Sequence, residues 1–292
     1  MTVLSAPAKV NLALEVCGHL PGGYHELDTV FSWLDLADRL EVAAAPRTEL
    51  EVEDAIGSGI PVGSGEDNLV LRALRALEAH VGRDLPTRFR LVRQIPAGGG
   101  LGGGSADAAA ALVGVDRVHG LSLAAPELAR LAAALGADVS FGLQGGTARG
   151  RGRGELLEPL PPPPDLPVLL LIPPFPLSTP QVYGAWDRLA EDERRPGRGS
   201  ADRVCRALSL GDARALQEAL GNDLQPAAES LRPELRELRE AMARAGCAAP
   251  MLCGSGSTLF GLLPADREPA EVVRNLEGLG HVVCTRFRRS PR

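Results

Sequence analysis

Residues 96–111 read PAGGGLGGGSADAAAA, and this stretch decides the fold class of the chain. Glycine fills six of the seven positions from Gly98 to Gly104, and an alanine-rich segment that predicts a helix follows directly. The alternating segment Thr87 to Ile95 before it predicts a strand. Backbone N–H groups of such a loop can converge on an anion, and the helix N-terminus adds partial positive charge. The stretch therefore predicts a nucleotide-phosphate loop, and a tight turn with close helix packing is the alternative.

Three common kinds of phosphate loop are excluded. A Walker A loop needs a lysine directly after its last glycine, but the single lysine of this chain is Lys9. Gly98, Gly100 and Gly103 formally match GxGxxG, but a dinucleotide-binding fold places that motif after its first strand, not this far along the chain. The H-R-D and D-F-G motifs of protein kinases do not occur in the sequence.

The overall composition indicates a globular protein of about two domains. The chain has 292 residues, of which 45% are hydrophobic and 23% charged. With a net charge of −6 it lacks the basic footprint of a nucleic-acid-binding protein. Its longest aliphatic run, Val168 to Ile172, is far shorter than the ~20 residues of a membrane span. The segment Met1 to Ser5 has no signal-peptide pattern, so we expect a cytoplasmic protein without membrane or nucleic-acid partners, either a monomer or a weak homodimer.

The five cysteines and five histidines show no metal-ligand spacing. No CxxC pair occurs, and the number of cysteines is odd. We therefore expect reduced, mostly packed cysteines and no metal held by protein side chains.

Lys9 is the first candidate for a chemical role, because every other basic residue is arginine. A compact ammonium fits a narrow pocket that the planar fork of arginine does not. Alternation from Val10 to Val16 predicts a half-buried strand, which places Lys9 and Asn11 on the same face. A solvated strand residue is the alternative reading of Lys9.

Asp138 is the second candidate, and it follows a predicted helix over 125–135 that stops at Gly136. It could act as a general base or simply cap the next short helix. Ser105 could likewise cap the helix after the glycine loop or contact a phosphate oxygen. Asp67 is predicted to be the N-cap of another helix, which Gly82 closes.

A cluster of prolines between Pro159 and Pro167 predicts a stiff connector between two domains, over 1–160 and 161–292. The first would bind ATP. The second begins with the buried strand 168–172, continues with a helix capped at Thr179, and ends in further strands and helices.

Three motifs in this order resemble those of the galactokinase, homoserine kinase, mevalonate kinase and phosphomevalonate kinase (GHMP) superfamily. They are PAKVNL at 7–12, the glycine loop at 96–106, and LCGSGSTLF at 252–260. GGYHEL at 22–27 and LADRL at 36–40 make the chain similar to the 4-diphosphocytidyl-2-C-methyl-D-erythritol kinase family within it. The three motifs span nearly the whole chain, which makes the resemblance far more specific than one glycine string.

This resemblance implies an α+β, two-domain GHMP-kinase-like fold. The N-terminal domain would be ribosomal-protein-S5-like, the C-terminal domain a ferredoxin-like α/β domain, and the active site would lie in the cleft between them. The implied reaction is ATP-dependent phosphorylation of the 2-hydroxyl of 4-diphosphocytidyl-2-C-methyl-D-erythritol, with Mg²⁺, in the non-mevalonate pathway to isopentenyl diphosphate. The alternatives are another GHMP small-molecule kinase, acting on homoserine or mevalonate, and a ligand-sensing relative without catalysis.

The resemblance also implies roles for individual residues. Asp138 would accept the hydroxyl proton, and Lys9 would steady that carboxylate and offset phosphate charge. ATP would contact Pro96, Ala97, Gly98, Gly99, Gly100, Leu101, Gly102, Gly103, Gly104, Ser105, Ala106 and Asn68. The substrate would contact Asn11, Tyr24, His25, Phe31, Thr179, Tyr183, Gly254, Ser255 and Gly256, with the cytosine between Tyr24 and either Phe31 or Tyr183, and with His25 at its polar edge. Tyr24 and Phe31 as core or rim residues are the alternative.

The sequence departs from the family pattern at a few positions. Ala106 stands where a second serine is usual, which puts a side-chain contact to phosphate in doubt. Ser140 and Gly142 differ from the residues common after the aspartate, and Cys253 replaces a serine or threonine. None of these changes removes a candidate catalytic group.

Overall fold

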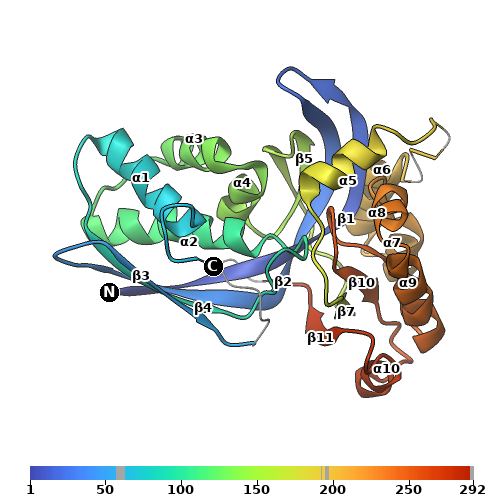
Figure 1. Ribbon diagram of the computed structural model, residues 1–292. Helices are drawn as coiled ribbons and strands as arrows, with labels where there is room; N and C mark the ends of the chain where they lie inside the picture. The colour runs from blue at the N-terminus through green and yellow to red at the C-terminus, as the bar shows by residue number, and fades with distance from the viewer. Residues whose placement is uncertain (57–62, 192, 195–196, 290–292) are drawn as a thin grey trace.

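The computed structural model describes residues 1–56, 63–191, 193–194 and 197–289 (Figure 1). Its first sheet has the strand order β3-β4-β2-β1-β8, and β5 pairs with β2 and with β6. The strands are β1 Thr2–Leu20, β2 Tyr24–Ala44, β3 Glu49–Asp54, β4 Thr87–Arg93, β5 Thr147–Gly152, β6 Leu156–Leu160 and the short β8 Gly221–Asn222. In the described part of the chain, no helix is long and apolar enough to cross a bilayer.

The long antiparallel hairpin of β1 and β2 connects the two halves of the molecule (Figure 1). The register shifts at three places along the hairpin, including one between Asn11 and Ala13. Val10 and Leu12 of β1 share a hydrophobic core with Val168 and Phe260 of the C-terminal half, so both halves pack on this strand. The strand was predicted to be half-buried, but Lys9 is buried as well as Val10 and Leu12. Gly102 of the glycine loop and Gly254 of the C-terminal half both pack against the Lys9 side chain.

Four helices pack on one side of the first sheet, as Figure 1 shows. They are α1 Leu69–Val81, α2 Gly103–His119, α3 Ala125–Leu135 and α4 Ala137–Gln144. The alanines of α2 let it lie close to the sheet: Ala108 to Ala111 are fully buried in the same core as Val42 and Phe89. The helix predicted over 125–135 is confirmed as α3.

Two predicted helix caps are wrong. The N-cap of α1 is Asn68, not Asp67, because the Asn68 side chain accepts a hydrogen bond from the backbone N–H of Val70 at 2.9 Å. The N-cap of the helix that begins at Thr179 is Ser178, not Thr179, and no side chain caps that helix. The N-cap of α2 is Gly102, so of the two roles left open for Ser105 the capping role does not apply.

The C-terminal half contains a four-stranded antiparallel sheet in the order β11-β7-β10-β9. Its strands are β7 Pro167–Ile172, β9 Ala248–Leu252, β10 Leu259–Leu262 and β11 His281–Arg286. Its helices are α5 Thr179–Trp186, α6 Ser200–Leu210, α7 Ala213–Ala219, α8 Gln225–Leu231, α9 Glu234–Ala245 and α10 Pro269–Asn275. With α5 to α9 between the first two strands and α10 before the last, the element order is the β-α-β-β-α-β of ferredoxin-like domains.

The segment between the two sheets runs from the end of β6 at Leu160 to the start of β7 at Pro167. Pro159 lies inside β6, which pairs only with β5 and is therefore an edge strand that tolerates proline. The short β8 pairs with β1, so the C-terminal half also adds to the first sheet. The domain limits 1–160 and 161–292 stay a prediction, and residues 290–292 lie outside the described part.

Candidate active site

Lys9 projects from β1 into a buried chain of polar side chains. Its Nζ donates to Oδ1 of Asn11 at 2.8 Å, and Nδ2 of Asn11 donates to Oγ1 of Thr29 at 2.8 Å. The Thr29 hydroxyl in turn donates to the carbonyl oxygen of Ala13 at 2.6 Å. Lys9 and Asn11 therefore lie on one face, as predicted, and the chain of hydrogen bonds fixes which end of the Asn11 amide faces the ammonium.

Asp138 is the second residue of α4, and its Oδ2 lies 3.6 Å from Nζ of Lys9. The N-cap of α4 is Gly136, and no side chain caps this helix, so Asp138 does not have the capping role that the sequence left open. The Lys9 side chain is 8% exposed and the Asp138 side chain 37% exposed. A carboxylate that is open to a cavity thus faces an ammonium that is otherwise buried.

The glycine loop packs directly on Lys9. The backbone N–H of Lys9 donates to the carbonyl oxygen of Leu101 at 2.9 Å. Gly102 has a φ of +71°, and a Cβ there would lie 3.0 Å from Cγ of Lys9. A Cβ on Gly100 would collide with the carbonyl oxygen of Cys253, in the third motif. The close-packing alternative therefore applies to Gly100 and Gly102, and both glycines also line a cavity.

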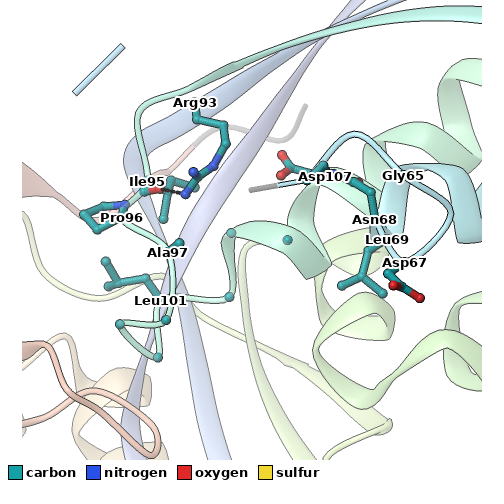
Figure 2. Close-up of a pocket in the computed structure, with 17 residues that line it drawn as sticks. Gly65, Asp67, Asn68, Leu69, Arg93, Ile95, Pro96, Ala97, Leu101 and Asp107 are labelled. Atoms are coloured by element: carbon teal, nitrogen blue, oxygen red, sulfur yellow. Dashed lines mark hydrogen bonds between the residues drawn. The ribbon is translucent and has the colours of Figure 1, made fainter. Parts of the chain in front are cut away.

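That cavity has a volume of about 470 Å³ and opens beside the loop (Figure 2). The loop segment with Pro96, Ala97 and Leu101 lies on one side, and Asn68 and Asp107 lie on the other. It is lined by Gly63, Gly65, Asp67, Asn68, Leu69, Arg93, Ile95, residues 96–104 and Asp107. Asn68 thus borders the cavity, although its amide is also engaged as the α1 cap and donates to the carbonyl oxygen of Gly63 at 2.7 Å. Ser105 and Ala106 continue into α2 and are not among the lining residues.

Two neighbouring carboxyl groups, Asp38 and Asp107, are buried near the start of α2. Oδ1 of Asp38 accepts hydrogen bonds from the backbone N–H groups of Gln94 at 2.5 Å and Ile95 at 2.7 Å, just before the loop begins. Burial raises the pKa of Asp38 to about 6, although those hydrogen bonds act to lower it. Burial, and then the nearby Asp38, raise the pKa of Asp107 well above its usual range. Burial therefore disfavours the charged form of Asp107.

A second cavity, of about 210 Å³, meets the first at Gly100 and Gly102. It is lined by Lys9, Asn11, Leu14, Leu27, Thr29, Phe31, Gly100, Gly102, Asp138, Arg153, Thr179, Tyr183, Gly254 and Ser255. The hydroxyls of Thr179 and Ser255 lie 2.8 Å apart, which ties the start of α5 to the third motif. Gly256 is not among the lining residues.

The predicted cytosine-binding residues do not all lie in this second cavity. The Tyr24 side chain is 55% exposed at the tip of the hairpin, with Cζ of Arg153 5.1 Å from its ring centre. Phe31 is buried and stacks on Phe141, with ring centres 4.8 Å apart. Tyr183 lies beside His25, with ring centres 4.7 Å apart. Phe31 and Tyr183 both line the second cavity, whereas Tyr24 and His25 are not among its lining residues.

Sequence reasoning missed several residues of the site. Thr29 continues the hydrogen-bond chain from Lys9 and Asn11, and Arg153 lines the second cavity together with Lys9. Asn222 donates through Nδ2 to the carbonyl oxygens of Leu252 at 2.9 Å and Gly254 at 2.8 Å, which holds the third motif in place. The positions of these three residues in the sequence form no recognisable motif, because only strand pairing and packing bring them to the site.

Comparison with known proteins identifies the family. The family model "GHMP kinases N terminal domain" matches residues 68–148, and "GHMP kinases C terminal" matches residues 204–281. A 4-diphosphocytidyl-2-C-methyl-D-erythritol kinase of Pelotomaculum thermopropionicum is 43% identical over 92% of this chain and 91% of its own length. That of Rhodococcus jostii is 42% identical over 98% of this chain and 91% of its own. The chain belongs to the 4-diphosphocytidyl-2-C-methyl-D-erythritol kinase family.

Solved structures agree with this family. A crystal structure of 4-(cytidine 5'-diphospho)-2C-methyl-D-erythritol kinase has a TM-score of 0.79 and 34% identity, covering 99% of this chain and 100% of that one. A homoserine kinase from Cytophaga hutchinsonii has a TM-score of 0.76 at 18% identity, covering 98% and 94% of the two chains, and this likeness concerns the fold alone. The predicted α+β, two-domain GHMP-kinase fold and the predicted family are confirmed.

Proposed function

We propose that the protein transfers the γ-phosphoryl group of ATP to the 2-hydroxyl of 4-diphosphocytidyl-2-C-methyl-D-erythritol. The observation that carries this proposal is the approach of Lys9 to Asp138 where the two cavities meet. The larger cavity beside the glycine loop would hold ATP, and the smaller one, here called the acceptor cavity, would hold the alcohol. In-line transfer needs a donor phosphate, an acceptor hydroxyl and a proton acceptor at one point. The family relationship favours this substrate over homoserine or mevalonate.

In the reaction, ATP lies in the larger cavity with its phosphates against the glycine loop, and the acceptor alcohol enters the smaller one. Asp138 accepts the proton as the 2-hydroxyl oxygen forms its bond to the γ-phosphorus and the bond to the leaving ADP breaks. Lys9 has three N–H donors, and Asn11 accepts one of them. The ammonium can therefore face both Asp138 and the incoming phosphate, which offsets the charge that develops during transfer.

Mg²⁺ neutralises phosphate charge when it is bound with ATP. Asp107 borders the nucleotide cavity, but burial raises its pKa and so disfavours the charged carboxylate that this ion prefers. Mg²⁺ would therefore be held mainly by phosphate oxygens and water in this cavity.

The cytidine diphosphate part of the substrate would lie toward the hairpin tip. Tyr24 and Tyr183 would flank the cytosine, and His25 would contact its polar edge. Arg153 lines the acceptor cavity, and its guanidinium also stacks on the ring of Tyr24. It therefore lies between the place proposed for the cytosine and the place proposed for the reacting alcohol, where the part of the substrate that links them would bind. That group is the diphosphate, and a guanidinium binds phosphate oxygens through paired hydrogen bonds. We expect the reaction to occur in the cytoplasm, and the chain to act as a monomer or weak homodimer.

A coupled assay of ADP release tests the proposal, with 4-diphosphocytidyl-2-C-methyl-D-erythritol, homoserine and mevalonate offered in parallel. We expect turnover with the first alcohol alone, and loss of that turnover in Asp138→Asn. Turnover with homoserine or mevalonate only would refute the substrate. Binding of ATP and cytidine ligands without ADP release would favour a ligand-sensing protein instead.

A further inference from the structure

A second group of side chains converges at the tip of the β1–β2 hairpin, outside the reaction centre. His19 and His25 face each other across the two strands, and Asp187 follows α5. Nε2 of His19 and Nε2 of His25 lie 3.0 Å and 2.8 Å from the same atom, Oδ1 of Asp187. Among the residues that the structure describes, no other set of three His, Cys, Asp or Glu side chains brings its ligand atoms together in this way.

We propose that His19, His25 and Asp187 form a binding site for a divalent transition-metal ion, with Zn²⁺ as the best match. Two imidazoles and one carboxylate are a ligand set that zinc uses, with water in the fourth position. Ligand atoms bound 2.0–2.1 Å from a tetrahedral ion lie about 3.3 Å apart. Oδ1 of Asp187 already lies 3.0 Å and 2.8 Å from the two nitrogens, and all three atoms lie within 4.8 Å of one another. An ion can therefore replace the bridging protons after side-chain rotations that bring the atoms closer by at most about 1.5 Å.

The surroundings hold the ligands in place and leave an entry path. Asp187 ends α5, and its backbone N–H donates to the carbonyl oxygen of Tyr183 at 2.9 Å. The ring of Trp186 lies against both histidines, 6.4 Å from His19 and 5.6 Å from His25 between centres. The His25 side chain is only 9% exposed, whereas His19 is 58% exposed. An ion therefore reaches the site from the His19 side.

The ligand types also select among cations. Imidazole nitrogens suit Zn²⁺ and other transition-metal ions. Mg²⁺ from the kinase reaction is no competitor, because it prefers oxygen ligands.

A bound ion should also affect catalysis, and this effect rests on the proposed function. The binding of the ion does not depend on that function. An ion on Nε2 of His25 fixes that ring beside Tyr183, so the ring cannot turn toward a cytosine. We expect Zn²⁺ to inhibit the kinase in competition with the cytidine substrate and not with ATP.

The direct test is a Co²⁺ titration of the full, metal-free chain, followed by displacement with Zn²⁺. We expect one site with the absorption of tetrahedral Co²⁺, weakened more than about tenfold in His19→Gln and in Asp187→Asn. His281→Gln is the matched control, because His281 lies in β11 and outside the cluster, and its affinity should equal that of the wild type. Circular dichroism confirms that each variant folds.

Inhibition is the second readout. His19→Gln should keep the wild-type turnover without zinc, and it should need at least about tenfold more Zn²⁺ for half-inhibition. Three results overturn the site: no saturable Co²⁺ binding by the wild type, equal affinity in both ligand variants, or a sulfur-to-cobalt charge-transfer band that places a cysteine in it. If the chain lacked kinase activity altogether, the Co²⁺ titration would still decide whether the metal site exists.

Discussion

Nζ of Lys9, on the long strand β1, lies 3.6 Å from Oδ2 of Asp138, at the start of the short helix α4. The two groups meet where the glycine loop turns from a nucleotide-sized cavity toward a smaller one. Lys9 is held from the opposite side by Asn11. The pair is therefore positioned before any ligand binds, which is the condition for electrostatic preorganisation.

Asp138→Asn should lower kcat by about 10²–10⁴, because an amide accepts no proton from the substrate hydroxyl. Affinity for ATP should change little, since Asp138 lines the acceptor cavity and not the larger one. Steady-state kinetics with ATP and the cytidine substrate, together with equilibrium ATP binding, measure both quantities. An unchanged kcat would remove Asp138 from the reaction.

Lys9→Arg should be as inactive as Lys9→Met, with a loss of roughly 10²–10³ in kcat. The reason is steric: a Cβ placed on Gly254 would already lie 3.1 Å from Nζ, and Gly102 packs on the lysine stem. The larger guanidinium therefore cannot occupy the position of the ammonium. Recovery of wild-type turnover by Lys9→Arg would show that charge alone is needed.

Gly102→Ala should reduce kcat on the order of 10²-fold, because the new methyl group pushes against Lys9 and moves its ammonium away from Asp138. The matched control is Gly120→Ala at the C-terminal cap of α2. Gly120 has a similar φ of +62°, but a Cβ there would have no neighbour within 4 Å. The control should lose about 1–2 kcal/mol of folding free energy from left-handed strain, with normal kinetics. Equal kinetic losses in both variants would indicate strain rather than displacement of Lys9.

Arg153→Gln should raise the KM for the cytidine substrate at least about tenfold with a smaller effect on kcat, because charge-assisted hydrogen bonds to the diphosphate are lost. Calorimetry should show that CDP binds more tightly than cytidine to the wild type, and that this difference shrinks in the variant. Arg151→Gln is the control: Arg151 pairs with Glu158 at 4.0 Å and does not line the acceptor cavity. A preference for CDP that survives in Arg153→Gln would place the diphosphate elsewhere.

Asp38→Asn should make the protein more stable at pH 7–8. Burial raises the pKa of Asp38 from 3.8 to about 6, so the folded state binds more protons than the unfolded state between these values. The free energy of unfolding of the wild type therefore falls as pH rises from about 4 to about 6, and the loss persists above. The asparagine keeps an oxygen for the N–H groups of Gln94 and Ile95 without this titration.

Urea unfolding at several pH values measures the effect. The variant should gain on the order of 1–3 kcal/mol over the wild type at pH 7–8, and the gain should vanish below about pH 4. Asp67→Asn, at an exposed position near the same cavity, serves as the control. A gain in stability that does not depend on pH would show that the raised pKa of Asp38 is not its cause.

Local sequence predicted the elements whose signals are short-range. The strand–loop–helix around the glycines, the helix over 125–135 and the strand over 168–172 follow from periodicity and from glycine stops, and they are present as expected. The wrong predictions concern residues whose role depends on the structure around them. Asp67 and Asn68 are both good capping residues, and only the path of the chain into α1 selects Asn68.

The sequence by itself determined the chemistry that is available: a single ammonium, a glycine-rich anion loop, and motifs that place the chain in its family. The tertiary structure alone decided which groups meet. The β1–β2 hairpin places Lys9 beside Asp138 and Asn11 beside Lys9, and the same hairpin brings His19 and His25 to Asp187. These contacts join residues far apart in the chain, so no local sequence pattern encodes them. They form because the two halves of the molecule pack on one shared strand, β1.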